Sequence, residues 1–151
     1  MGDLLQPWHL MVLFIVACFF LLPVVFYILA LSRALNKCSP ASRTIDPAML
    51  WLLLVPFVNL VWNFFVVLGM AKSLSNEFRL RNLPVSDPTP GQSIGIAMCI
   101  CAACTIIPIL GTVAWLACLV LWIVYWVKIA EFSRILDQPP IINPMQGASI
   151  G

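Results

Sequence analysis

Apolar residues are gathered into long runs along this chain, and every charged residue lies outside these runs. The runs extend from Trp8 to Leu31, from Ala48 to Ala71 and from Ile94 to Val127. A helix needs about 20 apolar residues to cross the hydrocarbon core of a bilayer, and each run reaches that length. The pattern therefore predicts helices that cross a membrane.

The first run predicts a permanent membrane helix over residues 8–32. A cleaved signal peptide is the competing interpretation, but Met1–Pro7 has no Lys or Arg and carries Asp3. The run is also longer than the apolar region of a signal peptide. Pro23 lies inside the run and is expected to bend the helix, because its ring removes one backbone hydrogen bond.

The second run predicts a helix over residues 48–71 that continues out of the membrane through Lys72 to Leu83. Pro56 provides an alternative, because a proline inside a helix can break it. In that case residues 48–55 dip into the membrane without crossing it, and a helix begins near Phe57. Both interpretations remain open on the sequence alone.

The third run contains 34 uncharged residues, which as one helix would extend about 50 Å. The hydrocarbon core is only about 30 Å thick, so two spans joined by a tight turn fit it better. Pro108 and Gly111 mark this turn. We expect spans over 93–107 and 112–133, followed by an extended, proline-rich tail over 137–151.

A weak internal repeat relates the second and third runs. In each, a turn that contains proline, Val55–Asn59 or Ile107–Gly111, opens a long helix with a charged exit. If the repeat is real, the chain forms two hairpins in the same orientation. The predicted fold is an all-α, polytopic membrane bundle in which residues 1–136 form one domain of about four transmembrane helices, arranged as two hairpins.

Composition supports a membrane protein and excludes one class of partner. Hydrophobic residues make up 62% of the chain and charged residues 9%, against about 45–50% and about 25% in soluble domains. So short a chain hides only part of its surface internally, so we expect membrane lipids and other membrane protein subunits as partners. The net charge is +2 with no basic stretch suited to a phosphate backbone, so we expect no nucleic acid partner.

Four crossings would place both termini on one side of the membrane. That side would hold five basic residues, and the other side would hold three, in the loop that follows the first run. The positive-inside rule then predicts that both termini are cytoplasmic. The five are Lys72, Arg79, Arg81, Lys128 and Arg134, and the three are Arg33, Lys37 and Arg43.

His9 is the only histidine of the chain. It could ligate one pigment or metal ion, but a membrane b-type haem commonly uses two axial ligands. It follows Trp8 at the start of a run, where amphipathic rings lie at the membrane interface. We therefore interpret His9 as an interfacial residue.

Cys99, Cys101 and Cys104 place soft ligands close together, and such ligands suit copper(I). On a helix, however, Cys99 and Cys101 point to different sides, so helix packing explains the cysteines better. We expect no metal or other cofactor of the protein's own. Small residues that recur every four positions let membrane helices approach closely; they are Gly91, Gly95, Cys99 and Ala103.

Asn59 and Asn63 share one face of the second helix. Amides within a membrane need partners, so this face is expected to contact protein or water, either through hydrogen bonds between helices or along a substrate path. No charged residue lies in the inner part of a span, which argues against a coupled transporter. The pairs Glu77/Arg81 and Glu131/Arg134 predict solvated helix faces.

Four segments carry a resemblance to small uncharacterised bacterial membrane proteins with four helices: Val55–Val67, Ala71–Phe78, Cys104–Gly111 and Tyr125–Ala130. The resemblance covers roughly Ala48 to Leu136. It implies a multi-pass protein of the bacterial cytoplasmic (inner) membrane, and it brings neither a function nor site residues.

The leading functional expectation is a non-catalytic structural or accessory subunit of a larger membrane protein complex. The first alternative is a small transporter or channel component that uses the Asn59/Asn63 face. The second is a pigment- or metal-binding membrane subunit. An enzyme is the least supported class, because the sequence offers no nucleophile–base pair, no carboxylate pair within a span and no Gly-rich phosphate loop.

Overall fold

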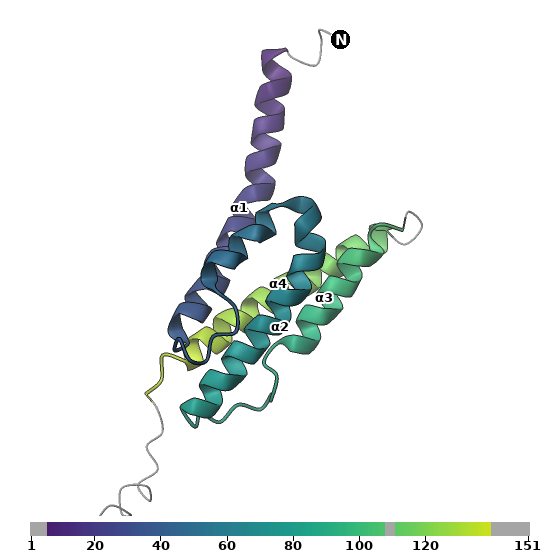
Figure 1. Cartoon of the computed structure of the whole chain (residues 1–151). Helices are drawn as coiled ribbons and strands as arrows, with labels where there is room; N and C mark the ends of the chain where they lie inside the picture. Colours follow the sequence, from purple (N-terminus) through teal and green to yellow (C-terminus); the bar gives the residue numbers. More distant parts are fainter. Residues whose placement is uncertain (1–5, 108–110, 140–151) are drawn as a thin grey trace, which may run out of the picture.

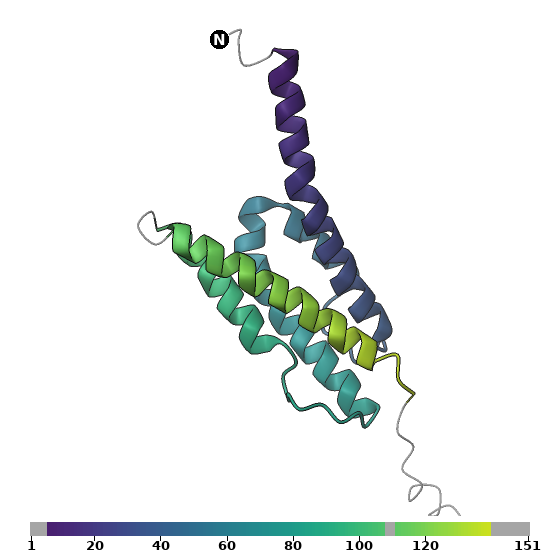
Figure 2. The same ribbon diagram turned by 180° about the vertical axis from the view of Figure 1, so that it is seen from behind.

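The first apolar run forms one helix, α1, over Pro7–Lys37 in the computed structural model, which describes residues 6–107 and 111–139. Pro7 occupies the first turn, where a helix tolerates proline because that N–H has no partner within the helix. The helix continues through Pro23 and changes direction near its middle, as expected for a proline inside a helix (Figure 2).

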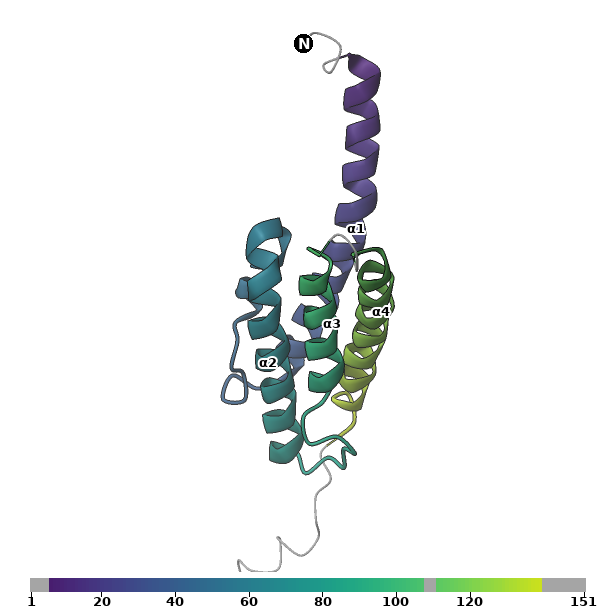
Figure 3. The ribbon, with the colours of Figure 1, turned by 90° about the vertical axis from the view of Figure 1, so that its right-hand side faces the viewer.

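Only the C-terminal half of α1 packs against the rest of the chain. Tyr27, Ile28 and Leu31 are buried, whereas most large apolar side chains between Trp8 and Leu22 are exposed. With 31 residues, α1 is about 46 Å long. Its N-terminal half therefore projects beyond the other helices (Figures 1 and 3).

The second apolar run is broken at Pro56. A 3-10 helix, η2, covers Pro47–Leu54, and the helix α2 covers Pro56–Leu80. The proline ends the preceding helix because it has no N–H to donate, and it suits the first position of the next helix. The structure therefore does not have one helix over 48–71; it has the break that the sequence offered as the alternative.

Two helical hairpins follow α1. In the first, η2 and α2 run in opposite directions, and the Trp62 Nε1 atom donates a hydrogen bond of 2.9 Å to the Met49 carbonyl. The second consists of α3, Gln92–Cys104, and α4, Gly111–Ile135. The expected turn residue Pro108 lies outside the described residues, and Gly111 begins α4.

The two hairpins have the same orientation, as the internal repeat predicts. Each begins with a short helix that leads to a break, and each returns through a helix of 25 residues. The long helices α2 and α4 run in the same direction, with α3 between them (Figure 3). Phe78 of α2 and Phe132 of α4 meet near their ends, with ring centroids 6.0 Å apart.

The small residues of α3 allow close packing over part of its length. Gly91, in the left-handed region with φ of 74°, lies against Tyr125, and it precedes the helix. A Cβ atom at Gly95 would collide with Val67 of α2 and Tyr125 of α4. Gly91, Gly95 and Cys99 are buried, whereas Ala103 is exposed. Three members of the predicted stripe therefore face the bundle, and the fourth faces outward.

All eight Lys and Arg residues lie towards one end of the bundle, where α1, α2 and α4 finish. The loop after α1 meets the end of α2, because Ser39 bonds to Glu77. Lys37 at the end of α1 contacts Asp137, just after α4, at 2.8 Å. The two groups of basic residues that were expected on opposite sides of a membrane therefore lie at the same end of the bundle, because the chain turns back at Pro56.

The described ends of the chain also differ from the arrangement expected from four crossings. The start of α1 projects from one end of the bundle, and the end of α4 lies at the charged end (Figure 1). Four passages would have brought the two ends together.

A buried ion pair joins three segments at the charged end. Glu77 is only 1% exposed and accepts a hydrogen bond of 2.7 Å from the Arg81 Nε atom. Its other carboxylate oxygen accepts bonds of 2.8 Å from the backbone N–H and the hydroxyl of Ser39. Arg81 also donates to the carbonyls of Lys37 and Leu136. The expected solvated face at Glu77 is thus wrong.

The corresponding glutamate of α4 is exposed, as expected, but its partner differs. Glu131 accepts a bond of 3.1 Å from Lys128, and both side chains are about half exposed. Arg134, the partner expected from the sequence, makes no ion pair or side-chain hydrogen bond within residues 6–107 and 111–139.

Three helices are long and apolar enough to cross a membrane: α1, α2 from Phe57 and α4. The described chain is all helical, and it is consistent with a multi-pass membrane protein; four crossings are not confirmed. α3 has 13 residues, which is well below the length of about 20 that a crossing needs. The uncharged parts of α2 and α4, residues 56–71 and 111–127, extend only about 25 Å each.

Candidate functional site

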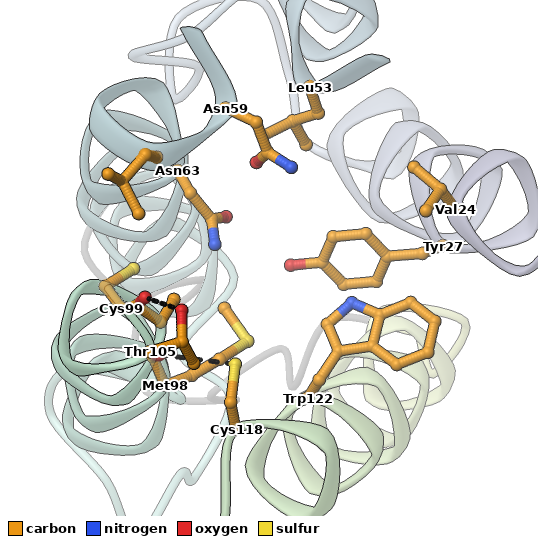
Figure 4. Close-up of a pocket in the computed structure, with 12 residues that line it drawn as sticks. Val24, Tyr27, Leu53, Asn59, Asn63, Met98, Cys99, Thr105, Cys118 and Trp122 are labelled. Carbon is orange, nitrogen blue, oxygen red and sulfur yellow. Dashed lines mark hydrogen bonds between the residues drawn. The ribbon is translucent and has the colours of Figure 1, made fainter. Parts of the chain in front are cut away.

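A cavity of about 260 Å³ lies in the middle of the bundle, and every helix contributes to its wall (Figure 4). We call it the central pocket. Its lining residues come from five segments: Val24 and Tyr27 of α1, Leu53 of η2, Asn59, Leu60 and Asn63 of α2, Met98, Cys99, Ala102 and Thr105 in and after α3, and Cys118 and Trp122 of α4.

Tyr27 is held by aromatic side chains of α4. Its ring lies 5.4 Å from that of Trp122 and 6.3 Å from that of Tyr125, measured between centroids. These contacts leave the side chain 3% exposed and direct its hydroxyl into the pocket (Figure 4). The hydroxyl has no hydrogen-bond partner among the described residues. A buried hydroxyl in this state costs free energy that a ligand can recover.

Asn59 and Asn63 approach the same space from α2. They lie one helical turn apart, and Figure 4 shows both amides directed towards the pocket that Tyr27 faces. The Oδ1 atom of Asn63 is buried and accepts no hydrogen bond from the described part of the chain. The break at Pro56 positions these amides, because it starts α2 less than a turn before Asn59.

Two other polar side chains of the wall, Thr105 and Cys118, already have hydrogen-bond partners. Thr105 donates a hydrogen bond of 2.6 Å to the Ala102 carbonyl and so closes the last turn of α3. The Cys118 thiol donates to the Met98 carbonyl at 3.8 Å and links α4 to α3. The groups that remain free to bond are those of Tyr27, the two asparagines and the Trp122 indole N–H, which has no hydrogen-bond partner among the described residues.

The lining defines the chemistry that the central pocket can accept. None of the residues that line it is Asp, Glu, Lys, Arg or His. The hydroxyl and the amides both donate and accept hydrogen bonds. The volume far exceeds the roughly 10–15 Å³ that one water requires, and it lies just below the roughly 300 Å³ of the smallest usual ligand sites. The pocket suits a small, uncharged molecule with hydrogen-bonding groups.

The structure brings together only some of the residues singled out in the sequence. Asn59, Asn63 and Cys99 line the pocket, whereas Cys101 and Cys104 do not. His9 lies at the far end of α1, with its ring stacked 3.5 Å from that of Trp8. No group of three metal-binding side chains occurs among the described residues.

Cys38, at the charged end, is also poorly suited to chemistry. The side chain is buried, and its thiol lies 3.5 Å from the Ala34 carbonyl. Burial and the nearby Glu77 carboxylate raise the pKa of the Cys38 thiol to about 11. It therefore remains protonated at neutral pH, whereas metal binding and nucleophilic attack need the thiolate.

Tyr27 and Trp122 were not recognised as pocket residues from the sequence. A signal existed for Tyr27, because tyrosine in a membrane helix usually lies at the interface. Tyr27 lies well inside its apolar run, where its hydroxyl needs a partner. Trp122 offered no comparable signal, since its position in the wall depends on how α1 and α4 pack.

The fold and the pocket define a class: an all-helical chain with three helices long and apolar enough to cross a membrane, two hairpins of the same orientation and a small polar cavity between them. No protein-family model, curated protein or solved structure matches the chain. The resemblance drawn from the sequence therefore stays a prediction.

Proposed function

We propose that the protein binds a small, uncharged, hydrogen-bonding solute in the central pocket and acts as a membrane transport or channel component. The observation that supports this proposal is the pair of buried, unpartnered atoms that face the same cavity, the Tyr27 hydroxyl and the Asn63 Oδ1. Broken helices around a site inside the membrane are also the arrangement that transporters use.

The environment of the pocket favours a neutral solute over an ion. A charge placed between these helices would have no countercharge, because no ionisable Asp, Glu, Lys, Arg or His lines the cavity. Irregular backbone within a membrane is tolerated where it lines a water-filled cavity or is covered by protein. The break before α2 meets this condition beside the pocket, since Leu53 and Asn59 on either side of it line the cavity.

Proteoliposomes provide the test, with urea and glycerol as probes and potassium as the charged comparison. We expect the protein to raise urea or glycerol permeability above that of empty liposomes and to leave potassium permeability unchanged. Asn63→Leu should abolish the increase. Tyr27→Phe should lower it about fivefold, since one hydrogen bond contributes about 1 kcal/mol. Stopped-flow light scattering measures these rates.

Tyr125→Phe is the matched control. Tyr125 is 1% exposed and its hydroxyl also lacks a partner among the described residues, but it does not line the pocket. Both Tyr→Phe variants remove an unpartnered buried hydroxyl, so both should fold at least as stably as the natural chain. Equal permeability for natural chain and Asn63→Leu, or equal losses in the two phenylalanine variants, would contradict the proposal.

The proposal includes an orientation. All eight basic residues lie towards the end where α1, α2 and α4 finish. The positive-inside rule places this end in the cytoplasm, so the start of α1 lies on the opposite side. In this arrangement α1 crosses the membrane, and each hairpin enters from the cytoplasm and returns to it.

Epitope tags at the two ends of the chain test this orientation. We use cells whose outer layers have been removed but whose cytoplasmic membrane is still sealed. In these cells, we expect an antibody to reach a tag placed before α1. A tag after residue 151 should be reached only when the membrane has been permeabilised. The same accessibility for both tags would restore the arrangement with an even number of crossings. The accessory role expected from the sequence remains a prediction.

A further inference from the structure

A second cavity, of about 550 Å³, lies between α1 and α4 at the charged end. One part of its wall is apolar and includes Phe26, Leu29 and Trp126. The other part is basic and includes Arg33, Lys37 and Arg134. We call this cavity the basic groove. It shares no lining residue with the central pocket, so a ligand of the groove is independent of the solute proposed for that pocket.

We infer that the basic groove binds one anionic phospholipid, with the phosphate at Arg33 and Arg134 and an acyl chain along Phe26 and Leu29. The two parts of the wall are ordered as a lipid requires. Arg33 follows Phe26 by seven residues on α1, which places its Cα atom about 10 Å nearer the charged end. Basic pockets between membrane helices on the cytoplasmic side are known to bind anionic head groups.

The charges of the groove are only partly compensated by the protein. Lys37 donates to the Asp137 carboxylate and to the Ser133 carbonyl, each at 2.8 Å. Arg33 and Arg134 are exposed, and neither side chain makes an ion pair or hydrogen bond in the parts of the chain that the structure describes. A phosphate therefore meets two available guanidinium groups, which bind phosphate oxygens in a two-pronged geometry.

The apolar wall distinguishes a lipid from a free anion. Phe26 is 57% exposed and Leu29 is 38% exposed, and both lie on the membrane side of the arginines. Trp126 completes the wall from α4, at the depth where amphipathic rings favour the membrane interface. A soluble phosphate would use the arginines alone, whereas a lipid would also cover these side chains.

Native mass spectrometry of the full chain in mild detergent tests the inference. The probes are phosphatidylglycerol and phosphatidylcholine with the same acyl chains, supplied in equal amounts. We expect one phosphatidylglycerol to be retained in preference. Arg33→Gln with Arg134→Gln should weaken its binding about thirtyfold, because each basic residue near the membrane surface contributes about fivefold.

Two further variants keep the result interpretable. Lys72→Gln with Arg79→Gln removes the same charge from α2, outside the groove, and should change phosphatidylglycerol binding less than twofold. Ala30→Trp keeps every charge and fills the groove beside Leu29, so it should reduce lipid retention as well. Thermal unfolding without added lipid should show that all three variants are folded.

Three results would overturn the inference. The first is equal retention of the two lipids by the natural chain. The second is equal loss of phosphatidylglycerol in the two double variants, which would indicate a general effect of charge. The third is displacement of the lipid by millimolar inorganic phosphate together with full retention in Ala30→Trp, which would make the groove a site for a free anion.

Discussion

Replacing Glu77 by leucine is expected to lower the free energy of unfolding by about 3 kcal/mol, the lower end of the range for breaking a buried ion pair. The carboxylate is 1% exposed and accepts bonds from Arg81 and from the backbone and hydroxyl of Ser39. Its removal leaves the Ser39 backbone N–H without an acceptor and the guanidinium without its countercharge, whereas the Ser39 hydroxyl keeps its contact of 3.0 Å with the Ser42 hydroxyl. We take the lower end of the expected loss in unfolding free energy because the Arg81 side chain is 26% exposed and keeps part of its solvation.

Unfolding in mild detergent with increasing dodecyl sulfate measures this effect, and Glu131→Leu is the matched control. Glu131 is also a helical glutamate paired with a nearby base, but its side chain is 57% exposed. Its pair should contribute less than about 0.5 kcal/mol. Losses of similar size in the two variants would mean that the Glu77 pair does not fasten the ends of α1, α2 and α4 together.

Gly95→Leu should destabilise the bundle by about 3 kcal/mol or prevent its assembly. Even a Cβ atom at this position collides with Val67 and Tyr125, so a larger side chain must separate α3 from α2 and α4. Overpacking a close-packed interior usually costs about 1–3 kcal/mol. The same unfolding assay reports the loss, and reduced permeability to the pocket solute should accompany it, since Met98 and Cys99 lie one turn further along α3.

Ala103→Leu is the control for Gly95→Leu: it shows whether a larger side chain on α3 is destabilising only where the helix is closely packed. Ala103 belongs to the same four-residue stripe, but it is exposed on the outer face of α3. A leucine there meets lipid instead of a neighbouring helix, so the free energy of unfolding should change by less than about 0.5 kcal/mol. Equal destabilisation by Gly95→Leu and Ala103→Leu would contradict the structure, because it would mean that both faces of α3 are closely packed.

The helical character and the breaks were predictable because they depend on local properties. The long apolar runs predict that α1, α3 and α4 are helices, and Pro56 marks the junction between η2 and α2. The number of crossings was not predictable from length alone. Residues 48–71 contain enough apolar positions for a span, and only the contact of the loop after α1 with α2 shows that the chain turns back.

The buried ion pair shows a different limit of sequence reasoning. Glu77 and Arg81 are four residues apart, and this spacing is common on solvated helix surfaces. The residue that makes the pair internal is Ser39, which is 38 positions away in sequence. No local pattern records such a contact. The Ser39 hydroxyl and N–H are ordinary loop groups until α1 and α2 are packed together.

The central pocket was predictable in part. Asn59 and Asn63 were expected to face protein or water because an amide in lipid needs a partner, and both line the cavity. The opposite wall, which includes Tyr27 and Trp122, could not be derived from the sequence, because it depends on the angle at which α1 meets α4. That angle places Tyr27 between Trp122 and Tyr125. The sequence thus identified one side of the site and left its depth and volume undetermined.

The unequal lengths of the helices also affect the surrounding bilayer. The uncharged part of α1 is about 36 Å long, whereas those of α2 and α4 reach only about 25 Å from the charged end. In the proposed arrangement, acyl chains in the leaflet distant from the charged end therefore meet the ends of short helices where a full-length bundle would offer a continuous wall. These lipids must tilt or compress around one side of α1, at a fraction of a kcal/mol for each ångström of mismatch. If the helices are embedded as proposed, we expect the protein to favour thin or easily deformed membrane, so that lipid composition influences where it resides.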